Sequence, residues 1–148
     1  MTEEIIKAIP ILLFVLLFSD DTMLNVELGL SIGLGFAIVE NTYIYVQGGA
    51  SYTVWWALER VVGASLMHAL CTAAIALFFT FANKRRKFFL TGTFAVLITV
   101  MMYHSVFNSL IQSSYMTWGM LLPIATFVPL VIVGIKKRDR LRAMRDTQ

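Results

Sequence analysis

The feature that most constrains this chain is a glutamate, Glu40, near the end of a glycine-paced apolar run over residues 26–46. A run of this length is typical of a helix that crosses a membrane, which needs roughly 20 apolar residues. A carboxylate at mid-bilayer costs on the order of 3 kcal/mol or more, so such a residue usually faces the protein interior and serves a function. The run therefore predicts a membrane helix with a functional carboxylate. Its small residues are expected to let neighbouring helices approach closely, and they are Gly29, Ser31, Gly33 and Gly35.

The whole chain is apolar. Of its 148 residues, 58% are hydrophobic and 14% are charged, which is far more apolar than a soluble domain and predicts an all-α polytopic protein in a lipid bilayer. The net charge of +3 does not indicate nucleic-acid binding, because the basic residues cluster beside the predicted membrane helices. The single cysteine, Cys71, allows no intrachain disulfide.

Apolar runs separated by polar breaks predict a bundle of about five helices. These are residues 3–18, 26–46, 61–81, 88–112 and 118–135. Residues 47–51 are expected to break the chain after the second helix, and the aromatic residues of 52–60 are typical of an interfacial segment. We therefore expect a transmembrane core over residues 1–135 and a basic tail over residues 136–148.

Two basic clusters predict the orientation. Residues 84–87 read Lys-Arg-Arg-Lys, and most charges after residue 135 are also basic. Lysine and arginine collect on the cytoplasmic side of membranes, and two predicted spans separate the clusters, so both fall on that side. We expect the N-terminus outside and the C-terminus in the cytoplasm. The acidic start and the lack of a cleavage site argue against a signal peptide, so the first helix is expected to be retained.

Polar side chains in four of the predicted helices lie at one depth. These residues are Glu4, Glu40, His68 and His104. With a helical rise of about 1.5 Å per residue, each lies roughly 20–24 Å above the cytoplasmic end of its helix. Residues four apart share one side of a helix. The pairs with that spacing are Glu3 with Lys7, Phe36 with Glu40, and His104 with Asn108. These groups are therefore expected to point into one cavity.

Such a cavity supports amide hydrolysis, which needs an activated water and a stabilised oxyanion. A carboxylate can take a proton from water, and neutral histidine and asparagine can donate hydrogen bonds to the oxyanion. Glu40, His68 and His104 also match a zinc set, and the residues leave both mechanisms open. Buried acids also serve as proton relays in small proton-coupled transporters. That alternative is weaker, because the polar groups lie in one half of the membrane and no inverted repeat is seen.

The order of these motifs resembles the PrsW-type intramembrane protease family, which is grouped with CAAX-type proteases and bacteriocin-immunity proteins. The motifs that carry the resemblance are Glu3-Glu4-x-x-Lys7, Gly35-Phe36-x-x-x-Glu40-Asn41, His68 and His104-x-x-x-Asn108. The resemblance implies an intramembrane endopeptidase of a bacterial cytoplasmic membrane. It would cut a single-pass membrane protein, of the anti-sigma-factor kind, near the extracytoplasmic face. A non-catalytic immunity or regulatory protein of the same fold is the alternative.

The resemblance also implies roles for individual residues. Glu3 and Glu4 would activate the water, and Glu40 stands where the CAAX-type relatives carry a histidine. His104 and Asn108 would hold the oxyanion, and His68 would orient water or bind metal. Lys7, Phe36 and Asn41 would support the site. Zinc bound by Glu40, His68 and His104 and a glutamate mechanism without metal remain alternatives.

Overall fold

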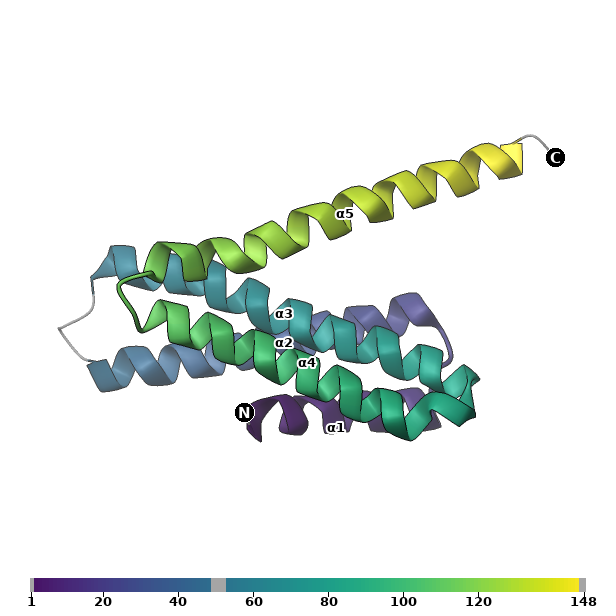
Figure 1. Cartoon of the computed structure of the whole chain (residues 1–148), viewed down its shortest axis with the longest axis horizontal. Helices are drawn as coiled ribbons and strands as arrows, with labels where there is room; N and C mark the ends of the chain where they lie inside the picture. Colours follow the sequence, from purple (N-terminus) through teal and green to yellow (C-terminus); the bar gives the residue numbers. More distant parts are fainter. Residues whose placement is uncertain (1, 49–52, 147–148) are drawn as a thin grey trace.

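The computed structural model describes residues 2–48 and 53–146, and within them every secondary-structure element is a helix (Figure 1). The elements are α1 (Thr2–Leu17), α2 (Thr22–Gly48), α3 (Val54–Lys84), the short 3₁₀ helix η2 (Arg86–Phe88), α4 (Phe89–Ile111) and α5 (Met116–Asp146). The prediction of an all-α bundle of about five helices is confirmed.

Four helices are long and apolar enough to cross a membrane: α2, α3, α4 and the Met116–Val133 part of α5. Their outward faces carry exposed apolar side chains, among them Val39, Leu90 and Val133, as expected for surfaces that contact lipid. With 16 residues, α1 is roughly 24 Å long, which is short of a hydrocarbon core of about 30 Å. The fold is that of an integral membrane protein.

The core of the bundle forms around α3, and α1, α2, α4 and α5 all pack against it. Half of its most apolar 18-residue window is buried, compared with 11–22% in the other three candidate spans. Met67, Ile75 and Ala76 of α3 are fully buried. Because α3 is central, its side chains can meet groups from every other helix, which makes it the natural place for a shared site.

Two glycines of α2 let that helix approach α3 closely, as predicted. A Cβ atom added at Gly29 would lie 2.7 Å from the carbonyl oxygen of Thr72, and one at Gly33 would lie 2.6 Å from that of His68. Both separations are too short for real side-chain contacts. The buried stripe of small residues therefore brings the α2 backbone beside His68, and Glu40 follows two turns further along α2.

The prediction that small residues allow close helix approach is wrong for Gly35 and Ser31, the other two small residues of this run. A Cβ atom at Gly35 would meet nothing within 4 Å. Ser31 is exposed, and its hydroxyl donates to the carbonyl oxygen of Glu27 in its own helix. Both residues lie on faces of α2 that do not contact α3, because only every third or fourth residue of a helix faces a given neighbour.

The aromatic segment expected over residues 52–60 is not a separate element. Residues 54–60 form the first two turns of α3, so the prediction that the third helix begins at residue 61 is wrong. The Thr53 side chain caps this helix by accepting a hydrogen bond of 3.1 Å from the Trp56 backbone, and no proline or glycine follows until Gly63. Of the predicted break, Gln47 and Gly48 belong to α2, while residues 49–52 lie outside the described residues.

The predicted basic tail continues a helix. The α5 helix runs through Pro123 and Pro129 and extends to Asp146, well past the expected end at residue 135. Figure 1 shows its second half standing away from the bundle, on the side where η2 joins α3 to α4. The two basic clusters therefore lie toward the same end of the molecule, as the orientation argument requires.

Candidate active site

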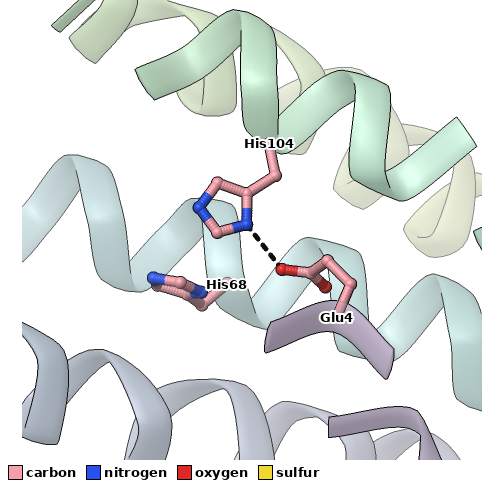
Figure 2. Close-up of side chains that lie close together, drawn as sticks. All are labelled: Glu4, His68 and His104. Atoms are coloured by element: carbon pink, nitrogen blue, oxygen red, sulfur yellow. Dashed lines mark hydrogen bonds and ion pairs between the residues drawn. The ribbon is translucent and has the colours of Figure 1, made fainter. Parts of the chain in front are cut away.

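Buried or half-buried polar side chains from four helices meet in the half of the bundle where α2 ends and α3 begins, which we call the site end. Figure 2 shows three of them: Glu4 from α1, His68 from α3 and His104 from α4. Their exposed fractions are 0%, 0% and 3%. One ligand-type atom from each residue lies within 4.8 Å of those of the other two. Segments far apart in the sequence therefore form one compact polar site.

Glu4 uses only one of its carboxylate oxygens within the cluster. Its Oε1 accepts hydrogen bonds from the Lys7 ammonium and from Nδ1 of His104, the latter at 2.6 Å. Its Oε2 is buried and has no hydrogen-bond partner among the described residues. A buried polar atom without a partner costs about 1–3 kcal/mol, and more when the group is charged. This oxygen is therefore available to a proton donor or a cation.

His104 presents a second free acceptor. When Nδ1 donates to Glu4, the tautomer with a single N–H carries its lone pair on Nε2. That nitrogen is buried and has no hydrogen bond in the described part of the chain. Oε2 of Glu3 lies 3.8 Å from this nitrogen, and the Glu3 side chain is 38% exposed. Glu3 thus lies at the rim of the site, and His104 lies inside it.

His68 has both ring nitrogens engaged. Its Nδ1 lies 2.8 Å from the Lys7 ammonium, which can only donate, so Nδ1 is the acceptor. Its Nε2 then carries the proton and donates it to Oε2 of Glu40 at 2.6 Å. The Phe36 ring flanks the pair, with its centroid 5.3 Å from the His68 ring and 4.7 Å from the Lys7 nitrogen. His68 therefore links the Lys7 ammonium of α1 to the Glu40 carboxylate of α2 through one imidazole.

Arg60 extends the network toward the end of the bundle. Its Nη2 lies 3.5 Å from Oε1 of Glu40, and its Nε donates to Oδ1 of Asn41 at 3.1 Å. The sequence offers Arg60, like Lys7, only as an alternative ion-pair partner for Glu40, and assigns residue 60 to an interfacial segment outside the site. The sequence does contain one indication of its position, since Arg60 lies eight residues, or about two helical turns, before His68. Residues at that spacing share a helix face only if α3 is continuous through both, as it is in the structure.

The charges along this network alternate in sign. Glu4 pairs with Lys7, and Glu40 pairs with Arg60, with His68 between the two pairs. Removing a charge from water costs several kcal/mol per ion, and an unpaired one is worse still. Ionisable residues inside membrane proteins are therefore rare and are kept mainly for function. The pairing explains how the fold tolerates this site, and the cost argues that the site is used.

Most of the residues singled out in the sequence come together here. They are Glu4, Lys7, Phe36, Glu40, Asn41, His68 and His104. Lys7 pairs with Glu4 three residues away and not with Glu3. Asn108 lies one turn after His104 and is half-buried, but its side chain makes no hydrogen bond with any described residue. The catalytic roles assigned to these residues stay predictions.

The donor set fits a zinc ion, with one adjustment. Catalytic zinc sites commonly use three protein ligands that combine histidine and a carboxylate. Glu4 and His104 each present a free buried acceptor atom. His68 completes the set only if Lys7 or Glu40 releases one of its nitrogens. The ligand set predicted from the sequence contained Glu40, whereas the structure groups Glu4 with the two histidines. Glu40 instead accepts a hydrogen bond from Nε2 of His68, the ring nitrogen that does not contact Lys7.

Comparison with known protein families identifies the chain's family. A family model described as PrsW family intramembrane metalloprotease matches residues 1–134. The matched range contains every residue of the polar network, and it confirms the resemblance drawn from the motifs. No curated protein and no solved structure matches the chain.

Proposed function

Because the chain belongs to the PrsW family of intramembrane metalloproteases, we propose that it cuts a single-pass membrane protein with a water molecule activated by Glu4. One observation carries this proposal. Glu4 Oε2 and His104 Nε2 are both buried acceptors without a partner among the described residues. A water molecule has two hydrogens to donate, so two acceptors can hold it with its lone pairs directed at a substrate carbonyl.

The chemistry follows from these groups. Glu4 takes one proton as the water oxygen bonds to the carbonyl carbon, and the carbonyl oxygen becomes an oxyanion. We propose that the Asn108 amide, one turn from His104 on α4, donates a hydrogen bond to that oxyanion. The carbon–nitrogen bond then breaks, and Glu4 returns its proton to the leaving amine. Lys7 keeps the other oxygen of Glu4 in place throughout.

The family name implies a metal, and the residues that would hold it are Glu4, His68 and His104. A bound metal ion would supply Lewis acidity, which eases the ionisation of water and polarises the scissile carbonyl. A bound ion would engage the Glu4 and His104 acceptors that otherwise hold the water, so the water-binding and proton-transfer roles given to Glu4 describe the site without metal. We propose zinc as the ion, since a glutamate and two histidines form a common catalytic zinc set.

The substrate would approach from the site end. A cavity of about 290 Å³ lies between the end of α2 and the start of α3. Its lining includes Asn41, Tyr45, Trp56 and Arg60, and Arg60 contacts Glu40. This supports an unwound segment of substrate lying beside the network. The basic clusters belong to the other end, so we propose that the site end is extracytoplasmic, where an anti-sigma-like protein would be cut.

The test is cleavage of tagged single-pass membrane proteins, including anti-sigma-like ones, co-expressed with the chain. Glu4→Gln and Glu40→Gln should abolish a cut made by the parent, because amides cannot accept the proton or hold the charged network. Glu27→Gln is the matched control, since this exposed carboxylate of α2 lies outside the network. A cut that survives both network substitutions, at equal membrane levels, would contradict the proposal. Absence of any cut by the parent would favour a non-catalytic role.

A further inference from the structure

We infer that Lys7 is a resident cation of this site and that it competes with a metal ion for Glu4 and His68. The inference uses the same cluster as the proposed function but does not depend on proteolysis. It concerns which cation the cluster holds, and this can be measured without a substrate.

Lys7 is held firmly inside the bundle. Its side chain is 1% exposed, which is rare for a lysine. The ammonium donates to Oε1 of Glu4 and lies 2.8 Å from Nδ1 of His68. The face of the Phe36 ring lies against it, with the nitrogen 4.7 Å from the centroid. The carboxylate, the imidazole and the ring face together make the kind of environment that selects a positive charge.

Two of the three residues that could hold a metal are therefore already bound to an internal cation. A metal ion needs a nitrogen lone pair from His68, but the Nδ1 lone pair accepts from Lys7. The other nitrogen, Nε2, donates its proton to Glu40 and has no lone pair to offer in this tautomer. The three residues can act as ligands together only after one of these bonds is exchanged.

Charge makes the competition stronger. Zinc lies about 2.0–2.2 Å from carboxylate and imidazole ligand atoms. An ion bound to Glu4 and His68 would therefore lie within a few ångströms of the Lys7 nitrogen, and like charges at such distances repel strongly where water is excluded. Whichever nitrogen His68 offers, the ammonium disfavours the ion. Removing the positive charge at residue 7 should thus increase metal affinity.

The test is zinc affinity of the purified chain in detergent, measured by competition with a chromogenic zinc chelator. Lys7→Met, which keeps the length and loses the charge, should bind zinc on the order of tenfold more tightly than the parent, the scale on which neighbours of metal ligands act. Lys7→Arg, which keeps the charge, should bind as weakly as the parent. Adding His104→Ala to Lys7→Met should remove the gain, because the zinc then lacks one of its ligands.

Each other outcome overturns the inference. Equal affinity in the parent and Lys7→Met would mean that the ammonium moves aside at no cost. Weaker zinc binding in Lys7→Met would mean that Lys7 supports the ligands. Absence of zinc binding in both the parent and Lys7→Met would mean that the cluster does not bind zinc, so that Lys7 does not compete with it. Helical content and the unfolding midpoint check that the variants fold. Lys7→Gln, a neutral hydrogen-bond donor, replaces the methionine variant if that one does not fold, with the same expected gain.

Discussion

The two ends of the α2–α3 interface both bury polar side chains, but of different kinds. At the site end, Glu40 and His68 form part of a charged network. At the opposite end, where α2 begins, Asn25 is fully buried and its amide nitrogen donates to Thr80 Oγ1 and to the Ser19 carbonyl, both at 3.0 Å. A neutral amide costs far less to bury than a charge. If polar contacts served only to hold the helices together, neutral side chains such as Asn25 would therefore be expected at both ends.

A free buried acceptor is not in itself a mark of catalysis, since both ends have one. Asn25 Oδ1 and Glu4 Oε2 both lack a hydrogen-bond partner in the described part of the chain. The difference lies in what the atoms can do. A neutral amide oxygen is too weak a base to take a proton from water, whereas a carboxylate oxygen can. We therefore expect substitutions at the site end to change the rate of cleavage and those at the opposite end to change stability.

Among substitutions outside the carboxylate network, the largest effect is expected for Asn108→Ala. If the amide stabilises the oxyanion, its loss should lower the turnover rate on the order of a hundredfold or more, with membrane levels unchanged, because such a donor acts mainly in the transition state. The measurement is the initial rate of reporter cleavage at saturating substrate. Asn83→Ala is the matched control, since Asn83 is a half-buried asparagine at the opposite end. Equal losses in both variants would remove the distinction between the two ends.

The sequence was sufficient for the fold and for most members of the site. Long apolar runs require helices in a membrane, and helical rise placed Glu4 and the histidines at one depth. The sequence did not determine which of these residues form ion pairs with one another. Glu3 and Glu4 both lie on a face near Lys7, at spacings of four and three residues, so periodicity could not choose between them. The same limit applies to the proposed metal set, because the grouping of Glu4, and not Glu40, with the two histidines depends on the packing of α1 against α3.

A smaller effect is expected for Gly33→Ala, which tests how the packing of α2 positions the site. The added methyl would meet the His68 carbonyl oxygen at 2.6 Å, so α2 must move away from α3. Glu40 should then lose its alignment with His68, and we expect cleavage to fall roughly tenfold, as small misplacements of catalytic groups do. Gly35→Ala is the matched control, because a Cβ atom there meets nothing. Parental rates in both variants would show that the close approach is not needed for activity.

The smallest effect on activity is expected for Asn25→Ala. This substitution removes both hydrogen bonds that tie the start of α2 to Thr80 and Ser19, and it leaves the Thr80 hydroxyl with only its bond to Ala76. Loss of buried hydrogen bonds typically costs about 1–3 kcal/mol. The midpoint of detergent-induced unfolding should therefore fall, while the cleavage rate per folded molecule should stay within about twofold of the parent, since no proton transfer involves this amide. A large loss of cleavage rate at unchanged stability would mean that the neutral end is coupled to the charged one. The assignment of catalysis to the site end and of stability to the opposite end would then be wrong.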